Sequence, residues 1–195
     1  MTDIDIIRHG EPEGGRRYRV HGVDDPLSEN GWRQMWAAMP ATPTWQHIIS
    51  SPLSRCHQFA EKLAAKLNIG YSIEDNLKEI GFGSWEGRTP DDIEQNDGDA
   101  LKRFLSDPLN NRPPGAEPLT SFADRVWEVY QRRMQQHAGQ HILFVGHAGV
   151  IRAITSRVLD MPLDAVYSKL KVEYAAIVRT RQSDKPGKSP VLIIK

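Results

Sequence analysis

Three consecutive residues near the N-terminus, Arg8, His9 and Gly10, have the side chains that phosphoryl transfer needs. A neutral imidazole can attack phosphorus, an adjacent guanidinium can hold the phosphate in line, and a glycine lets the backbone approach closely. The three residues follow a short apolar run at positions 4–7, which predicts a strand that ends just before them. A lone histidine after a strand is more often a loop or surface residue, so this interpretation needs partners elsewhere in the chain.

Two more candidates occupy equivalent positions in the predicted fold. Arg55 opens the helix that follows the second predicted strand, and His147 follows an unbroken apolar run at residues 142–145. The carboxyl ends of parallel strands converge on one edge of a sheet, where helix N-termini offer unpaired N–H groups to anions. Residues far apart in the sequence can therefore meet around one phosphate. His147 can instead be a core histidine, but Gly146 and Gly149 beside it allow backbone N–H groups near a bound anion.

Glu79 is the candidate proton donor, because it follows the third predicted strand closely enough to reach the same edge of the sheet. A phosphate ester needs a proton for its leaving oxygen. A carboxyl group beside a dianionic phosphate keeps its proton, since a second negative charge there is disfavoured, and so it can serve as a general acid near neutral pH. The alternative is that Glu79 is one exposed loop carboxylate among many, which composition alone favours.

Short runs rich in Ile, Val and Leu alternate with longer stretches of helical periodicity, which is typical of an α/β protein with a mostly parallel sheet. A helix is expected over residues 28–39, with Ser28 as its N-cap. After a buried strand at 47–50, Ser51 and Pro52 predict the N-cap and first turn of a second helix. Further strands are expected at residues 71–73, 142–145, 174–180 and 191–194, and further helices at residues 122–133 and 149–159.

Residues 81–118 are rich in Gly, Pro, Asp and Asn around a short predicted helix at 100–105. This composition predicts a cap-like insertion over one end of the sheet, where it shapes substrate access. Residues 184–187 form a strong turn signal between the last two strands, which predicts an edge hairpin. No repeat, linker or change of composition marks a boundary, so residues 1–195 are expected to form a single domain.

Composition limits the expected partners. Lys plus Arg number 25, as do Asp plus Glu, so no overall field attracts nucleic acid or an anionic membrane. The single cysteine, Cys56, excludes an internal disulfide and fits a reducing compartment. The N-terminus has aspartates where a signal peptide needs lysines, and no apolar run reaches membrane-spanning length. We therefore expect a soluble, cytoplasmic protein with a small-molecule partner, and no pattern indicates an oligomeric state.

Four blocks, in the same order, resemble the successive signatures of the histidine phosphatase superfamily, the phosphoglycerate mutase-like group. They are Arg8-His9-Gly10, Ser51-Pro52-Leu53-Ser54-Arg55, Leu77-Lys78-Glu79 with Gly83-Ser84-Trp85-Glu86-Gly87, and Val145-Gly146-His147. The resemblance runs from residue 4 to about residue 160 and implies a three-layer αβα sandwich. It also implies that His9 accepts the phosphoryl group and that Glu79 donates the proton. The implied phosphate-binding residues are Arg8, Arg55 and His147, and no metal or cofactor is implied.

Within this superfamily the sequence favours metal-independent hydrolysis of a small phosphorylated metabolite, because mutases share the catalytic blocks but usually have longer chains. The loops at residues 20–28, 51–56 and 113–118 resemble those of α-ribazole-5′-phosphate phosphatases of cobalamin assembly. One alternative is mutase-type phosphoryl transfer. The other is a catalytically weak module that binds phospholigands or phosphoproteins.

The remaining polar residues carry weaker hypotheses. Arg16, Arg17 and Arg19 can recruit a second anionic group, but such a run in a Gly-rich loop is more often solvated surface. Cys56 is expected to be a small core residue, because no phosphate-cradling loop follows it. The other histidines lack metal-ligand spacing and are expected to be structural or solvated: His21, His47, His57, His137 and His141.

Overall fold

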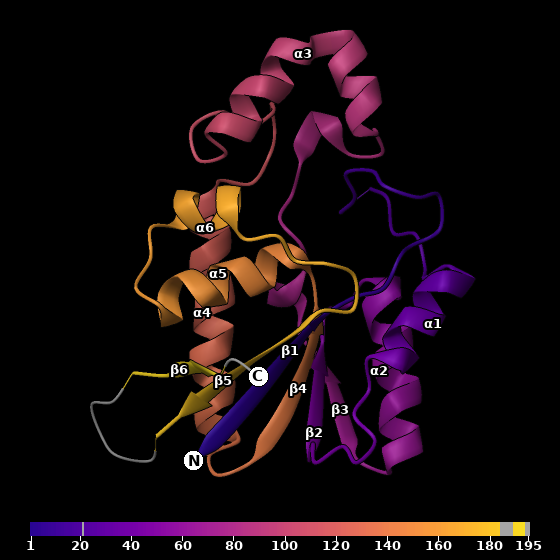
Figure 1. Cartoon of the computed structure of the whole chain (residues 1–195), viewed down its shortest axis with the longest axis vertical. Helices are drawn as coiled ribbons and strands as arrows, with labels where there is room; N and C mark the ends of the chain where they lie inside the picture. Colours follow the sequence, from indigo (N-terminus) through magenta and orange to yellow (C-terminus); the bar gives the residue numbers. More distant parts are fainter. Residues whose placement is uncertain (21, 184–188, 194–195) are drawn as a thin grey trace.

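The computed structural model describes residues 1–20, 22–183 and 189–193. Within this part of the chain, six strands form one sheet in the order β3-β2-β4-β1-β5-β6 (Figure 1). The strands are β1 (Thr2–Arg8), β2 (His47–Ser50), β3 (Gly70–Ile73), β4 (His141–Gly146), β5 (Ile177–Gln182) and β6 (Val191–Ile193). The strands β1 to β4 pair in parallel, whereas β5 and β6 extend the β1 edge in antiparallel order. The sheet is mixed, with the parallel centre that the sequence predicts.

Helices cover both faces of this sheet. They are α1 (Glu29–Ala37), α2 (Ser54–Leu67), α3 (Pro90–Ser106), α4 (Leu119–Gln136), α5 (Ala148–Val158) and α6 (Leu163–Lys169), with the 3₁₀ turns η1 (Asp75–Leu77) and η2 (Gly83–Trp85). Along β4, Ile142 and Phe144 pack with α4 and α5, while Leu143 and Val145 pack with α1 and α2. This alternation follows from the period of two in a strand. The fold is the predicted three-layer αβα arrangement.

The N-terminus of α2 differs from the prediction. The N-cap position is Leu53, which makes no side-chain capping bond, and the helix begins at Ser54. The carboxylate of Asp24, from a distant loop, accepts the Ser54 N–H at 2.9 Å. The hydroxyl of Ser51 lies instead 2.8 Å from Nε2 of His147. The prediction that Ser51 is the N-cap of this helix is therefore wrong: its hydroxyl accepts the N–H of Leu53 at 3.3 Å, one position before the helix, and Asp24 satisfies the first N–H of the helix itself.

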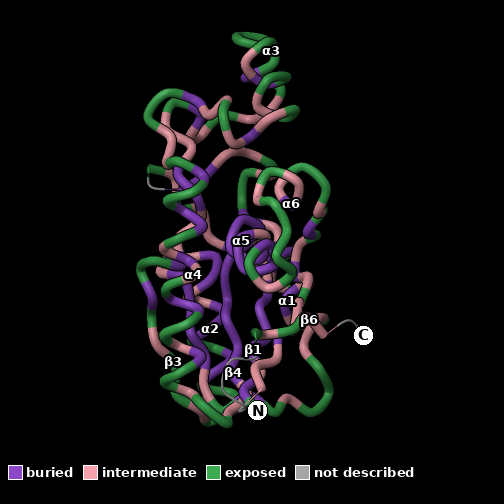
Figure 2. Tube along the Cα trace, turned by 90° about the vertical axis from the view of Figure 1, so that its left-hand side faces the viewer, coloured by how far each residue is buried: buried purple, intermediate pink, exposed green. Residues whose placement is uncertain are grey.

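The segment at residues 81–118 is more helical than predicted. The helix expected at 100–105 is the last part of α3, which bends at Asp97, where φ is −158°. Thr89 and Asp92 form a reciprocal capping box at its start. The helix α3 projects beyond the carboxyl ends of the parallel strands (Figures 1 and 2). Buried side chains hold η2 against it: Trp85, Ile93 and Leu101. That this segment is a cap within a single domain stays a prediction.

The C-terminal strands form the predicted hairpin at the sheet edge, with β5 beginning at Ile177 rather than at Tyr174. The predicted turn at residues 184–187 and the last residue of the predicted strand, Ile194, lie outside the described residues. The short helix α6 was not predicted. None of the helices in the described part of the chain has the length and apolarity needed to cross a bilayer.

Candidate active site

His9 directly follows β1, where its backbone N–H donates to the carbonyl of Gly146 at the end of β4, at 2.9 Å. The side chain is buried, and its Nδ1 lies 2.7 Å from the carbonyl oxygen of Gly10. A carbonyl only accepts, so this contact places the ring proton on Nδ1 and leaves the lone pair on Nε2. Burial, and then the charges of Arg55 and Arg8, hold the pKa of His9 well below its ordinary value. The ring is therefore neutral, with a free lone pair on Nε2.

Gly10 has a role in packing that the sequence did not indicate. A Cβ at this position would lie 2.3 Å from the carbonyl oxygen of Gly31 in α1. The two backbones can approach this closely only because Gly10 has no side chain. The expectation was an approach to phosphate, and the close approach that the structure shows is to α1.

Arg55 presents a buried and largely unpartnered guanidinium. Its exposure is only 2%, and its Nε and Nη1 have no hydrogen-bond partner among the described residues. The carboxylate of Asp24 lies 3.6 Å from Nη1, beyond hydrogen-bonding distance. A buried charge with free donors is costly unless an anion satisfies it. Arg55 therefore has the features of an anion-binding residue.

Arg8 is held at the rim of the same site by two contacts. Its Nη1 donates to the carbonyl of Val172 at 2.5 Å, and its guanidinium lies 4.1 Å from the ring centroid of Tyr174. Its Nε is buried and has no hydrogen-bond partner in the described part of the chain. The side chain is thus fixed in direction while one donor stays available.

His147 is fully buried beside His9, with 5.2 Å between the two ring centroids. Its Nε2 pairs with the hydroxyl of Ser51 at 2.8 Å, and the thiol of Cys56 lies 3.6 Å from the same atom. Burial and then the positive charge of Arg55 hold the pKa of His147 well below its ordinary value. The imidazole is neutral and held in place by these contacts, and it lies next to His9 without lining the cleft described below.

Glu79 is oriented by two backbone amides. Ile80 N–H donates to Oε1 at 3.0 Å, and Gly149 N–H, in the first turn of α5, donates to Oε2 at 3.0 Å. The sequence suggested that amides at the start of this helix approach a bound anion directly. The structure shows that the Gly149 amide holds the Glu79 carboxylate instead, which is a favourable place for an acidic group.

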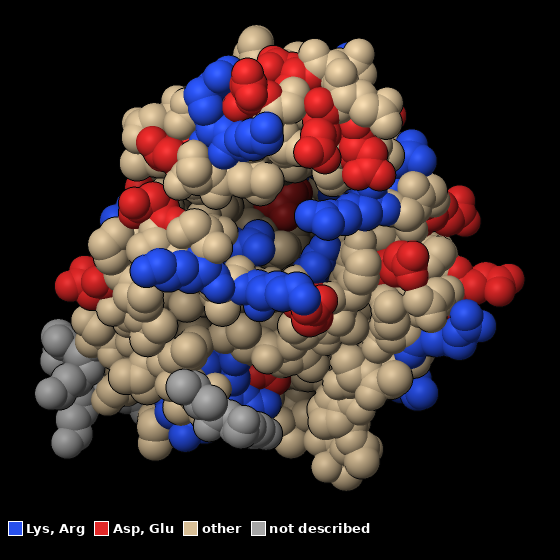
Figure 3. All heavy atoms as spheres, turned by 45° about the horizontal axis from the view of Figure 1, so that its top comes forward, with Lys and Arg blue, Asp and Glu red and all other residues tan. Residues whose placement is uncertain are grey.

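These side chains surround a cleft of about 100 Å³ at the carboxyl edge of the sheet. Four of the five predicted residues line it, namely Arg8, His9, Arg55 and Glu79, whereas His147 does not. Figure 3 shows a hollow below the projecting segment, with basic side chains around it and an acidic side chain inside. The arrangement brings a neutral imidazole, two arginines and a carboxyl group together around a space of phosphate size.

Two arginines that the sequence analysis set aside also line this cleft, Arg17 and Arg19. Arg19 is buried, and its Nε donates to the carboxylate of Asp25 at 2.5 Å. Its charge also lowers the pKa of His9, after burial and the charges of Arg55 and Arg8. The one sequence signal for these two arginines was the arginine-rich run itself. That signal is weak, because such runs usually lie on the solvated surface.

Cys56 is buried, and three of the other histidines make contacts within the fold, as expected: His47, His137 and His141. Burial raises the pKa of the Cys56 thiol to about 12, so the thiol stays protonated and is no nucleophile. The rings of His47 and His137 stack at 4.8 Å. His141 Nε2 lies 3.0 Å from Oδ2 of Asp5. His21 lies outside the described residues.

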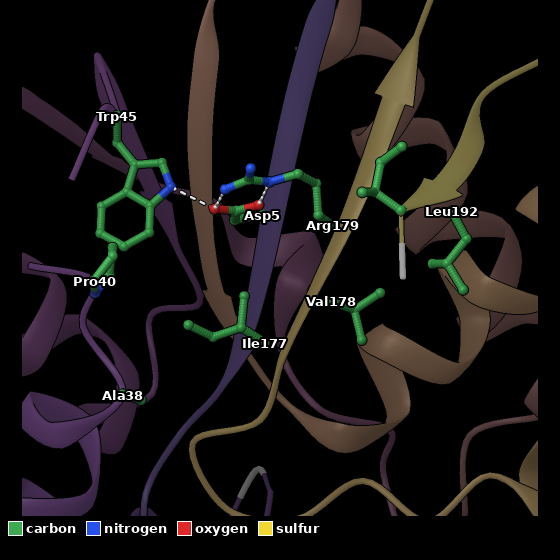
Figure 4. Close-up of a pocket in the computed structure, with 9 residues that line it drawn as sticks. Asp5, Ala38, Pro40, Trp45, Ile177, Val178, Arg179 and Leu192 are labelled. Atoms are coloured by element: carbon green, nitrogen blue, oxygen red, sulfur yellow. Dashed lines mark hydrogen bonds and ion pairs between the residues drawn. The ribbon is translucent and has the colours of Figure 1, made fainter. Parts of the chain in front are cut away.

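A larger cavity of about 430 Å³ lies away from the cleft, beside β5 and β6 (Figure 4). Its one carboxylate, Asp5, accepts from Arg179 at 2.5 and 2.7 Å and from Trp45 at 2.9 Å. Although burial opposes ionisation, the hydrogen bonds from Arg179, His141 and Trp45 lower the pKa of Asp5. The hydrogen bonds of this carboxylate are thus taken up by protein groups, and the residues predicted for the site line the smaller cleft instead.

Comparison with known proteins identifies the family of this chain. The family model described as "Histidine phosphatase superfamily (branch 1)" matches residues 4–189. The chain is 30% identical over 180 residues to the "Bifunctional protein Rv2228c" of Mycobacterium tuberculosis, with 90% of this chain and 49% of that protein covered. It thus spans about half the length of that curated relative. It is 25% identical to the "Probable phosphoglycerate mutase GpmB" of Klebsiella pneumoniae, with 95% of this chain and 87% of that protein covered.

Solved structures share the fold along almost the whole chain. "Bacillus stearothermophilus YhfR" superposes with a TM-score of 0.89 at 26% identity, and covers 100% of this chain and 96% of its own. The "Alpha-ribazole Phosphatase from Shigella flexneri" superposes with a TM-score of 0.84 at 23% identity, with coverages of 98% and 95%. At 23% identity, the similarity to the Shigella flexneri phosphatase shows a shared fold and nothing more.

Proposed function

Since the chain belongs to the histidine phosphatase superfamily (branch 1), we propose that it is a phosphatase that hydrolyses a small phosphate monoester through a phosphohistidine on His9, without a metal. One observation carries the proposal. The unprotonated Nε2 of His9 lines the same cleft as the buried guanidinium of Arg55, whose Nε and Nη1 have no hydrogen-bond partner among the described residues although Asp24 pairs with its charge at 3.6 Å. The first is a nucleophile, and the second supplies free donors for the phosphate that it attacks.

In the first step, Nε2 of His9 attacks phosphorus and the bond between phosphorus and the ester oxygen breaks. Glu79 gives its proton to that leaving oxygen, so the alcohol departs neutral. The guanidinium groups of Arg8 and Arg55 stabilise the negative charge on the remaining phosphoryl oxygens. His147 does not line the cleft, so the phosphate-binding role that we propose for it rests on its position next to His9 alone.

In the second step, water attacks phosphorus and the bond between phosphorus and Nε2 breaks. The Glu79 carboxylate, now ionised, takes the proton of the attacking water. Inorganic phosphate leaves and the neutral imidazole is restored. The bond from Nδ1 to the Gly10 carbonyl orients the ring in both steps and disfavours the other tautomer.

The test is phosphate release from p-nitrophenyl phosphate by the purified protein in the presence of a metal chelator. We expect turnover that the chelator does not change. Tight phosphate binding without turnover would favour a phospholigand-binding module. Transfer of the phosphoryl group to added phosphoglycerate, with little release of phosphate, would favour the mutase chemistry that the name of one relative suggests.

The physiological substrate and location are finer proposals. The loops at residues 20–28, 51–56 and 113–118 support α-ribazole 5′-phosphate, an intermediate of cobalamin assembly, as one substrate to assay. The neutral formal net charge supports a small-molecule partner rather than nucleic acid or a membrane. The one cysteine, reduced and buried, supports a cytoplasmic location.

A further inference from the structure

We propose that a second cavity, beside the cleft, binds the alcohol part of the substrate and favours alcohols that carry a carboxylate. This inference rests on the proposed phosphatase activity. The cavity measures about 230 Å³. Glu79, Tyr18 and Phe82 line both the cavity and the cleft. An ester oxygen protonated by Glu79 therefore lies at the boundary, and the carbon atoms attached to it extend into the cavity.

Arg112 is the first cation in the wall of this cavity. It is partly buried, its Nη2 donates to the carbonyl of Gly81 at 2.8 Å, and its buried Nε has no hydrogen-bond partner among the described residues. The guanidinium lies 5.0 Å from the ring centroid of Phe82. Because the guanidinium is largely withdrawn from water, the pKa of Arg112 is lowered. An anion in the cavity would satisfy that charge and its free donor.

Arg152 is the second cation in the wall, and it comes from α5. Its Nε donates to the carbonyl of Leu170 at 2.9 Å, which fixes the direction of the side chain. The Arg152 guanidinium lies 5.6 Å from the ring centroid of Tyr167, another residue of the cavity wall. Burial raises the pKa of Tyr167, and the charges of Arg152 and Arg112 both act against that rise. The two cations thus act on one region of the cavity.

Among the described residues that line the cavity, Glu79, which the mechanism uses, is the one with an acidic side chain, and the charge of Glu117 acts on Arg112 from outside the lining. Its lining residues are Tyr18, Glu79, Ile80, Phe82, Phe104, Leu105, Pro108, Arg112, Gly149, Arg152, Tyr167 and Ser168. Two positive charges over apolar and aromatic walls suit a small organic acid. A carboxylate matches the planar donors of a guanidinium, and the carbon chain covers the rings.

Size and charge together narrow the substrate class. A cavity of about 230 Å³ is smaller than the roughly 300–1,000 Å³ that drug-sized ligands occupy, so it suits a small phosphorylated hydroxy acid. The alcohol part of α-ribazole 5′-phosphate has no acidic group to meet the two arginines. The chemistry of this cavity therefore ranks acidic alcohols above that substrate.

The experiment compares two substrates that differ in one group. In 3-phosphoglycerate the alcohol carries a carboxylate, and in glycerol 3-phosphate a hydroxymethyl group replaces it. We expect kcat/KM for phosphate release to be at least about tenfold higher for 3-phosphoglycerate, the effect of one charge-assisted hydrogen-bonded pair. p-Nitrophenyl phosphate is assayed in parallel as a substrate without an acidic alcohol.

Substitutions in the cavity wall test whether the cavity causes the preference for 3-phosphoglycerate. Arg112→Gln and Arg152→Gln should each lower the ratio of the two kcat/KM values at least about fivefold, and Arg112→Lys should keep part of it. Arg103→Gln is the matched control, because Arg103 is an exposed arginine of α3 that does not line the cavity. The control should keep the ratio, and circular dichroism should show that every variant is folded.

The outcomes separate this inference from the proposed function. Hydrolysis of p-nitrophenyl phosphate with equal kcat/KM for the two natural esters would overturn the inference and leave the phosphatase intact. A preference that survives both glutamine variants would also overturn it. No phosphate release from any of the three esters would overturn the proposed function, and the inference with it.

Discussion

The amide of Gly149 donates to Oε2 of Glu79 at 3.0 Å, which links the start of α5 to a loop residue 70 positions earlier. There is no room for a side chain at this contact. A Cβ on Gly149 would lie 2.1 Å from Oε1 of Glu79 and 3.1 Å from the hydroxyl of Tyr167. The glycine therefore sets where the proposed general acid lies.

Gly149→Ala should displace the Glu79 carboxyl group. A shift of about 1 Å in a catalytic group can cost on the order of a hundredfold in rate, so we expect kcat for an alkyl phosphate to fall by that amount. Gly98→Ala in α3 is the control, because the nearest atom to its new Cβ is 3.7 Å away. Unchanged kcat in Gly149→Ala would show that the position of Glu79 does not limit the reaction.

Glu79→Gln should separate substrates by their leaving groups. The amide keeps the size of the side chain but has no proton to give, so an alkyl phosphate should lose about 10² to 10⁴ in kcat. p-Nitrophenolate leaves with little protonation, and its ester should lose much less. The measurement is kcat for both esters with the wild type and the variant. Equal losses on the two would contradict the general-acid role.

Stability should fall as the pH falls below the ordinary pKa of histidine, 6.5. Burial holds the pKa values of His9 and His147 well below that in the folded state. The unfolded chain therefore binds up to two protons that the folded chain does not, and the free energy of unfolding decreases toward low pH. The slope approaches about 2.7 kcal/mol per pH unit for the two sites together.

Urea unfolding at several pH values between 7 and 5 measures this slope. His47, whose pKa burial also lowers, acts in the same direction. His9→Gln removes one of the buried imidazoles and should reduce the slope by about one proton, or about 1.4 kcal/mol per pH unit. A free energy of unfolding that stays level, or rises, as the pH falls from 7 to 5 would contradict neutral burial of the two histidines.

Patterns within short segments of the sequence were enough to predict the fold and to predict that the site residues lie close together. Apolar runs that end in polar residues predicted the parallel strands, and carboxyl ends of such strands meet at one edge. Arg8, His9, Arg55 and Glu79 could therefore be placed together before any coordinates were known, and the structure places them around one cleft.

Features that depend on distant partners were not predictable in this way. Ser51 has the sequence context of a helix cap, but its hydroxyl meets His147 and Asp24 caps the helix instead. Arg19 sits in a run typical of solvated surface, yet Asp25 holds it in the cleft. In the first case contacts between distant segments outweigh the local preference, and in the second the folded path of a single loop brings Asp25, six residues further on, to Arg19. Sequence spacing alone encodes neither arrangement.

The capping box of α3 was a local signal that the sequence analysis missed. Thr89 and Asp92 have the spacing of a helix start, and a proline follows Thr89 directly. The many Gly, Asp and Asn residues nearby favoured a loop and obscured it. The helix α6 was missed because seven residues give too few positions for a clear period.

The central claim is that His9 carries the phosphoryl group, and trapping the intermediate tests it most directly. The protein is mixed with a ³²P-labelled monoester, quenched within milliseconds and digested, and the labelled peptide is identified. We predict an acid-labile phosphohistidine at His9 in the wild type, and neither label nor turnover in His9→Ala. Label retained by His9→Ala, or turnover that survives the substitution, would contradict the account.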